Sequence, residues 1–163
     1  MLVLCLSYTK VEAQGGVTYY LDSTPVDSKN ILTTTPPPNS RELSGKFANG
    51  QNQEWSTKLT GDIKGGVYSF SIWLAAVGSS CRVDIILNQR GKETTLATWD
   101  KLTTTDTEKY QLVKRETAGA TLNAGAGDRL VLRITNTGTK YPDWVHILEA
   151  ADGQQSSITI SPK

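Results

Sequence analysis

Hydrophobic and polar positions alternate most clearly in the stretch 65–87. In its first half, large apolar side chains occupy every second position: Tyr68, Phe70, Ile72 and Leu74. After a Gly-Ser-Ser break at 78–80, a second alternating run extends from Cys81 to Leu87. A period of two is typical of a strand with one buried and one solvated face. Two runs joined by a short Gly/Ser segment predict a β-hairpin, which we place at the core of the protein.

Shorter alternating segments recur along the rest of the chain. The clearest is 129–135, with Leu130, Leu132 and Ile134 on one face. In the segment 55–60, Trp55, Thr57 and Leu59 share a face. We expect further strands at 17–21, 43–47, 94–99, 109–115, 121–122, 144–148 and 157–160. No segment has a convincing amphipathic helical period, so the chain is predicted to be all-β: a β-sandwich jelly roll of about nine or ten antiparallel strands.

The composition separates a terminal segment from one domain. Residues 1–14 hold a short apolar run, and Val11 and Ala13 place small residues before Gln14, as signal peptidase prefers. We interpret 1–14 as the remnant of a signal peptide or a disordered tail, and expect a secreted or cell-surface protein. Residues 15–163 are expected to form a single β-sandwich domain. Within it, 22–40 is predicted to be a proline-rich loop, because prolines 36–38 cannot donate hydrogen bonds to a sheet.

Charge and cysteine content narrow the classes of function. The 17 Lys and Arg residues balance 16 Asp and Glu residues, with no basic stripe, which argues against nucleic-acid binding. No segment approaches the length of a membrane span, so no membrane insertion is expected. Cys81 alternates in phase with an apolar face and is interpreted as a buried, unreactive thiol. A Cys5–Cys81 disulfide is the alternative.

Three segments carry a family resemblance. They are 55–74, which contains Gly-Gly-Val-Tyr-Ser-Phe at 65–70; 122–134, which contains Gly-Asp-Arg-Leu at 127–130; and the closing Ser-Ser-Ile-Thr-Ile-Ser-Pro at 156–162. Together they resemble the galactose-binding-like, carbohydrate-binding-module-type jelly-roll domains of secreted or surface proteins, over residues 17–162. The resemblance implies a jelly roll that often serves as an accessory carbohydrate-binding or adhesive module. It implies no particular ligand, because a fold does not fix a function.

The candidate catalytic motifs in the sequence are incomplete. His146 is the only histidine and stands between Val145 and Ile147, without a Gly-x-Ser-x-Gly elbow in the chain, which favours a structural role. The Gly-Ala-Gly-Asp sequence at 125–128 has Leu130 where a dinucleotide-binding loop needs glycine, so we interpret it as a turn into a strand. The carboxylates are scattered over turns rather than paired for glycoside hydrolysis. We therefore expect no enzyme activity.

Aromatic residues are the best candidates for ligand contact: Trp73, Trp99, Tyr141 and Trp144. Trp73 is out of phase with the apolar face of its strand, Trp99 ends a strand before a polar loop, and the other two lie in or beside the loop Tyr-Pro-Asp-Trp at 141–144. An exposed aromatic ring can stack on the apolar face of a sugar. The alternative is that loops cover these rings and they only pack.

A structural calcium ion is implied by the resemblance, since turn carboxylates and backbone carbonyls are suitable ligands. The candidate ligands are Asp22, Asp143 and Asp152, chosen because they lie near the first and last strands, which tend to be neighbours.

These features predict a secreted, non-catalytic module whose partner is a polysaccharide, a glycan or another surface polymer. The alternative is a structural or adhesive domain that makes contacts with a protein partner on a cell surface. A sugar binder should expose its aromatic rings, whereas a structural domain should bury its tryptophans.

Overall fold

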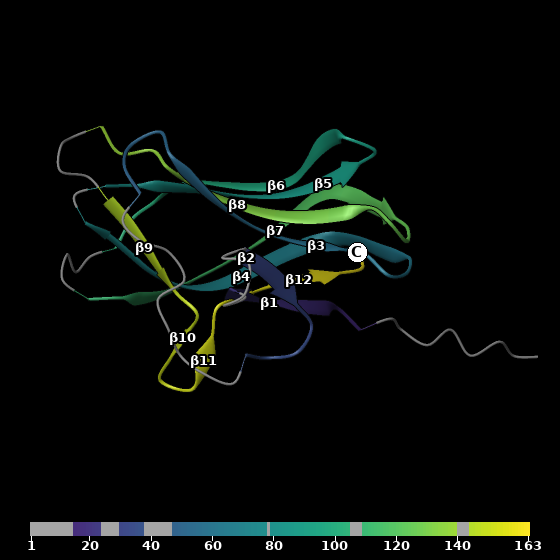
Figure 1. Ribbon diagram of the computed structural model, residues 1–163, viewed down its shortest axis with the longest axis horizontal. Coiled ribbons are helices and arrows are strands. Elements are labelled where there is room, and N and C mark those ends of the chain that lie inside the picture. Colours follow the sequence, from purple (N-terminus) through teal and green to yellow (C-terminus); the bar gives the residue numbers. More distant parts are fainter. Residues whose placement is uncertain (1–14, 24–29, 38–46, 78, 105–108, 140–143) are drawn as a thin grey trace, which may run out of the picture.

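The computed structural model describes residues 15–23, 30–37, 47–77, 79–104, 109–139 and 144–163, and all elements in these ranges are strands (Figure 1). Their bounds are β1 Val17–Ser23, β2 Asn30–Thr33, β3 Asn52–Lys58, β4 Ile63–Val77, β5 Cys81–Gln89, β6 Lys92–Leu102, β7 Gln111–Ala124, β8 Arg129–Asn136, β9 Trp144–Leu148, β10 Ala150–Ala151, β11 Gln154–Gln155 and β12 Ser157–Ser161. The all-β prediction is confirmed. No helix in the described ranges is long and apolar enough to cross a membrane.

One ten-stranded sheet organises the chain, in the order β6-β5-β8-β3-β2-β1-β12-β4-β7, with β9 paired to β4 beside β12. β10 and β11 form a separate two-stranded hairpin. The sheet curls, so that β5, β6 and β8 lie along one side and β1, β4 and β12 along the other (Figure 1), consistent with a β-sandwich. The expectation of antiparallel pairing throughout is wrong, because β2 and β3 pair in parallel, through Ile31 and Ser56 alone. The jelly-roll assignment stays a prediction.

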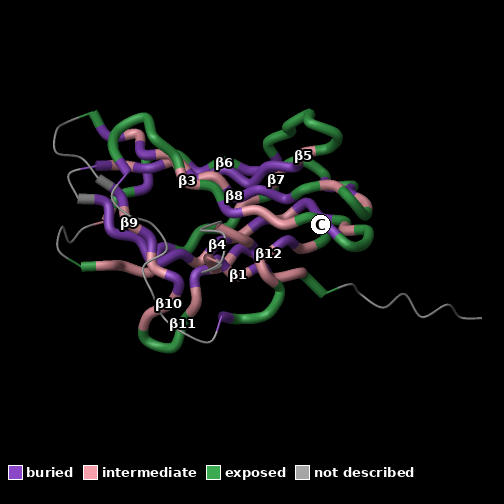
Figure 2. Tube along the Cα trace, in the orientation of Figure 1, coloured by how far each residue is buried: buried purple, intermediate pink, exposed green. Residues whose placement is uncertain are grey.

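The core lies between the two layers and follows the alternation in the sequence. The in-phase residues of β4 are exposed by 3% or less: Tyr68, Phe70, Ile72 and Leu74. On the opposite layer, Leu130, Leu132 and Ile134 of β8 are fully buried. Figure 2 shows these buried stretches along facing strands. Burial of each large apolar side chain contributes about 1.5–3 kcal/mol, which makes this cluster the main source of stability.

The predicted hairpin between the two halves of 65–87 is wrong. β4 pairs with β12, β9 and β7, whereas β5 pairs with β6 and β8, so the chain crosses between layers after β4. Alternation fixes which face of a strand is buried but does not fix its partner. The consecutive buried residues Leu74, Ala75 and Ala76 show that the end of β4 is covered on both faces, as expected where a chain changes layers rather than at a hairpin turn.

Two loop predictions also need correction. The segment 22–40 was expected to be a loop, but β1 continues to Ser23 and Asn30–Thr33 forms β2, which pairs with β1. The strands predicted at 109–115 and 121–122 belong to one strand, β7, since backbone pairing to β4 carries it through weakly apolar sequence. Most of the predicted strand 43–47 lies outside the described residues, as does 1–14, although Phe47 forms a bridge with Val145.

The two ends of the curled sheet meet where β7 approaches β6. Gly119 lies against the backbone of β6 so closely that a Cβ there would overlap the carbonyl oxygen of Leu96 and lie 2.8 Å from the Tyr68 ring. Only glycine fits such a close approach of two backbones. The Tyr68 hydroxyl, in turn, donates a hydrogen bond of 2.6 Å to the carbonyl oxygen of Ala120 on β7. That bond ties β7 to β4, and the place where Gly119 brings β7 against the backbone of β6, without backbone pairing among the described residues, is called the β6/β7 seam here.

Candidate functional site

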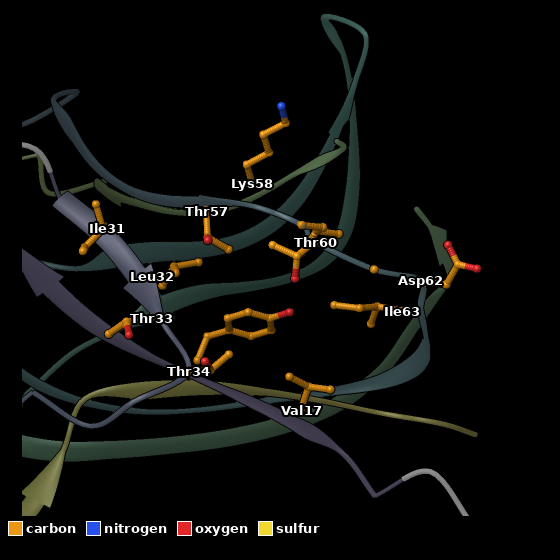
Figure 3. Close-up of a pocket in the computed structure, with 13 residues that line it drawn as sticks. Val17, Ile31, Leu32, Thr33, Thr34, Thr57, Lys58, Thr60, Asp62 and Ile63 are labelled. Carbon is orange, nitrogen blue, oxygen red and sulfur yellow. The ribbon is translucent and has the colours of Figure 1, made fainter. Parts of the chain in front are cut away.

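A pocket opens beside the junction of β2 and β3. The parallel contact between β2 and β3 is a single residue pair, Ile31 and Ser56. Past this pair, β3 leaves the sheet through the turn 59–62, and a cavity of about 540 Å³ lies among β1, β2, the end of β3 and that turn (Figure 3). This volume is within the roughly 300–1,000 Å³ of typical small-molecule pockets. Its lining consists of Val17, Tyr19, Ile31, Leu32, Thr33, Thr34, Thr57, Lys58, Leu59, Thr60, Gly61, Asp62 and Ile63.

The interior of the pocket is uncharged. Figure 3 shows the side chains of Val17, Thr60 and Ile63 converging on the same space. The ammonium group of Lys58 and the carboxylate of Asp62 point away from that space. The surface that a ligand would meet is therefore made of aliphatic groups and hydroxyls, with both charges at the rim.

Tyr19 is the polar residue that reaches the pocket from the core. It pairs with Ile158 of β12, its ring packs in the core, and only 4% of the residue is exposed. Among the residues that the structure describes, its hydroxyl has no hydrogen-bond partner, and burial raises the pKa of this phenol above its ordinary value. The hydroxyl oxygen is not among the buried, unpartnered side-chain atoms of the described residues, so it keeps contact with the pocket and can bond water or a ligand there.

Thr57 shows how far the pocket reaches between the layers. It occupies an inward-facing position of β3 between Trp55, which is fully buried, and Leu59, which is 3% exposed. Thr57 is nevertheless half-buried and lines the cavity. The alternation in the sequence places Trp55, Thr57 and Leu59 on one face, so Thr57 is a hydroxyl among core residues. That polar residue in the apolar phase was the signal that could have indicated the pocket.

A turn from another part of the chain fixes the pocket wall. The backbone N–H of Leu59 donates to the carbonyl oxygen of Asp128 at 2.8 Å, and the N–H of Gly127 donates to the carbonyl oxygen of Leu59 at 2.9 Å. The Asp128 carboxylate accepts hydrogen bonds from the N–H of Gly125 at 3.0 Å and from the side chain of Gln89 at 2.7 Å. These bonds, first the one from Gly125, lower the pKa of Asp128. The predicted turn at 125–128 is confirmed, and it supports the pocket.

The predicted aromatic platform residues lie elsewhere. Trp73 is 9% exposed, its indole N–H donates to the carbonyl oxygen of Gln154 at 2.8 Å, and its backbone N–H donates to the Ser156 hydroxyl at 2.9 Å. The β10–β11 hairpin thus covers this outward-facing ring. Trp99 is also 9% exposed and packs edge-on against Phe70, with ring centroids 4.9 Å apart.

Neither Trp73 nor Trp99 lines the pocket. Tyr141 and the side chain of Trp144 lie outside the described residues, and the ligand-binding role of all four aromatics stays a prediction.

The predicted calcium ligands are not brought together within the described part of the chain. Asp22 is half-buried at the end of β1, where its carboxylate accepts a hydrogen bond of 2.6 Å from the N–H of Ser23. Asp152 is exposed in the turn between β10 and β11, with a φ of 50°. Asp143 lies outside the described residues. No group of three His, Cys, Asp or Glu residues suited to a metal ion occurs in the described ranges. The calcium site stays a prediction.

Two residues considered for chemistry occupy structural positions. His146 is half-buried on β9, and its Nδ1 lies 3.1 Å from the Tyr110 hydroxyl. Cys81 is a free, fully buried thiol, as predicted, and desolvation raises its pKa to about 12. A thiol with so high a pKa is not a nucleophile at neutral pH.

No protein-family model and no curated protein matches this sequence. Among solved structures, a CocE/NonD family hydrolase from Staphylococcus aureus matches with a TM-score of 0.66 at 11% identity, over 89% of this chain and 36% of that chain. A second structure of a CocE/NonD family hydrolase from the same organism gives a TM-score of 0.64 at 12% identity, with the same coverage. This chain therefore spans about a third of the hydrolase, and the likeness establishes the fold alone.

Carbohydrate-binding modules of family 6 also match, in line with the resemblance seen in the sequence. One from Clostridium stercorarium, solved in complex with cellobiose, has a TM-score of 0.44 at 11% identity, over 89% of this chain and 82% of that chain. A TM-score below 0.5 does not establish a shared fold, so the similarity of fold rests on the hydrolase structures.

Proposed function

We propose that this domain binds a neutral saccharide in the pocket between β1, β2 and the end of β3, without cleaving it. The observation that carries the proposal is Tyr19, a nearly buried residue that lines a pocket of small-molecule size and whose hydroxyl keeps solvent contact and lacks a partner among the described residues. The ring of the same residue offers an apolar surface. An aromatic ring joined to a polar group is the combination that suits a sugar, which has an apolar face and a rim of hydroxyls.

Binding would rest on hydrogen bonds and apolar contact rather than on charge. The Tyr19 and Thr60 hydroxyls can each donate one hydrogen bond and accept others, and sugar hydroxyls do the same. The charged groups of Lys58 and Asp62 point away from the space, so an anionic or cationic sugar would find no counter-charge inside. A neutral ligand fits this environment best.

The proposed context is a non-catalytic module of a secreted or cell-surface protein. The leader-like segment at 1–14 supports secretion. The lining of the pocket holds no histidine and no cysteine, and its carboxylate, Asp62, points outward, so a general acid and base are not assembled there. A bound calcium ion stays part of the proposal, to be tested by chelation.

The test is a glycan-array screen of the full chain, followed by calorimetry on any hit, with calcium and with chelator. We expect a neutral glycan to bind, and Tyr19→Phe or Thr57→Val to weaken it at least several-fold while the thermal unfolding temperature stays unchanged. Thr95→Val, an exposed threonine on β6 outside the pocket, is the matched control. Binding that survives both pocket variants would place the ligand elsewhere.

A structural or adhesive domain is the second candidate, and one observation favours it. The three tryptophans whose side chains the structure describes, Trp55, Trp73 and Trp99, are all buried. A flat platform of exposed tryptophans is therefore missing from the described surface, as a domain that contacts protein rather than polysaccharide would show. Absence of any glycan hit, with or without calcium, would support this second function.

A further inference from the structure

The apolar share of the pocket points to a particular kind of sugar. Resting on the proposed function, we infer that the pocket selects a saccharide that presents a methyl group, either the C6 methyl of a 6-deoxy sugar or the end of an acetamido group, where a common hexose presents a hydroxyl. A 6-deoxy sugar and an N-acetylated sugar are the two forms of this chemistry.

The supply of hydrogen bonds inside the pocket is small. The uncharged side-chain polar groups available are the hydroxyls of Tyr19, Thr34, Thr57 and Thr60, whereas the Thr33 hydroxyl already accepts from the N–H of Thr35 at 3.2 Å and donates to the carbonyl oxygen of Thr35 at 3.3 Å. The lining contains no Asn, Gln, Arg or His. A fully hydroxylated hexose has more donors and acceptors than these groups can satisfy at once, and each buried hydroxyl left without a partner weakens binding.

The apolar surface, by contrast, is incompletely covered. Val17 and Ile63 are only partly buried, pack against the edge of the core and converge on the pocket in Figure 3. Leu32 and Leu59 continue this surface inward. A methyl group that leaves water to contact these side chains gains favourable free energy, while a hydroxyl in the same place loses its hydration. Both terms favour the sugar with the apolar substituent.

The test compares sugars that differ at one position, using calorimetry or NMR titration of the full chain. Methyl α-L-fucopyranoside is compared with methyl α-L-galactopyranoside, and methyl α-L-rhamnopyranoside with methyl α-L-mannopyranoside. N-acetyl-D-glucosamine is compared with D-glucose. We expect the deoxy or acetylated member of at least one pair to bind about ten-fold more tightly, with the deoxy and acetyl arms identifying which group fits.

Two variants assign the preference to the apolar surface. Val17→Thr replaces a methyl group with a hydroxyl at nearly constant shape, and Ile63→Thr replaces the ethyl branch with a hydroxyl; both positions are partly exposed, so the fold should tolerate the changes. We expect either variant to reduce the ten-fold preference to two-fold or less. Val67→Thr, a half-buried position on β4 outside the pocket, should leave it unchanged.

The outcomes separate the two proposals. Equal or tighter binding of the fully hydroxylated sugars, lost on Tyr19→Phe, would overturn this inference while leaving saccharide binding in place. A preference that persists in both Val17→Thr and Ile63→Thr would also overturn it. Failure of every sugar to bind would overturn the proposed function together with the inference.

Discussion

The sheet comes together in two places, and it does so in opposite ways. At the β6/β7 seam, Gly119 lets two backbones touch, and beside it the Tyr68 hydroxyl ties β4 to β7 through the carbonyl oxygen of Ala120. At the junction of β2 and β3, one parallel residue pair and a side-chain hydrogen bond from Asn30 to Gln53 join the strands. There the Tyr19 hydroxyl lacks a partner among the described residues, and Thr57 keeps half-exposed surface at a core position.

The two places differ in whether the chain itself provides a partner for a tyrosine hydroxyl. Both tyrosines are buried, in neighbouring parts of the same curled sheet, yet only one has its polar end satisfied by the chain. A polar group that the chain leaves unpaired beside a pocket is available to bond water or a ligand. The seam is built to be closed, and the β2/β3 junction leaves room and one hydroxyl for something outside the chain.

The largest expected effect compares a glycine at each place. Gly119→Ala should destabilise the protein by about 1–3 kcal/mol or more, because the new methyl group overlaps the Leu96 carbonyl oxygen and forces the seam apart. Gly61→Ala, on the pocket side, has nothing within 4 Å of the new Cβ and should change stability by less than about 0.5 kcal/mol. Urea unfolding of both variants measures the difference. Similar costs for the two would contradict the view of a closed seam and an open junction.

A smaller difference in unfolding free energy is expected when the hydroxyl of Tyr68 or of Tyr19 is removed. Tyr68→Phe should cost about 1 kcal/mol, because it removes the 2.6 Å hydrogen bond and leaves the Ala120 carbonyl oxygen without that donor. Tyr19→Phe removes a hydroxyl that bonds nothing among the described residues, so its cost should stay below about 0.5 kcal/mol. Chemical denaturation gives both values. A cost for Tyr19→Phe as large as that for Tyr68→Phe would mean that the Tyr19 hydroxyl has a structural partner.

The alternation of apolar residues in the sequence predicted much of what closes the core. Tyr68, Phe70 and Leu132 were placed correctly because period two fixes which face of a strand is buried. The hairpin between β4 and β5 was wrong, because strand partners depend on contacts far away in sequence, which no local pattern records. β2 was missed inside a proline-rich stretch because it is short and stays in the sheet by pairing with β1.

The candidate site was less predictable. Exposed aromatic rings were sought on strand faces, but Trp73 is covered by a hairpin that follows it by about eighty residues, since Gln154 bonds its indole. The pocket depends instead on where two strands part, and that is a property of the sheet rather than of any motif. Only Thr57, a hydroxyl in the phase of Trp55 and Leu59, gave a local sign of it.

The smallest expected effect is a pH dependence confined to the pocket side. Hydrogen bonds from Gly125 and Gln89 lower the pKa of Asp128 below its ordinary value of 3.8, so its charged form stabilises the turn that holds Leu59. This contribution is present above that ordinary value and is lost as the pH falls through the lowered pKa.

Asp128→Asn keeps an oxygen acceptor but removes the charge. The variant should therefore be slightly less stable than the parent protein at neutral pH, and the gap should close below pH 3.8. Urea midpoints across this range measure the gap, and backbone amide NMR signals locate it. Shifts near Leu59 without shifts near Ala120 would confine the effect to the junction, whereas a gap that does not change with pH would show that the Asp128 charge does not support the pocket wall.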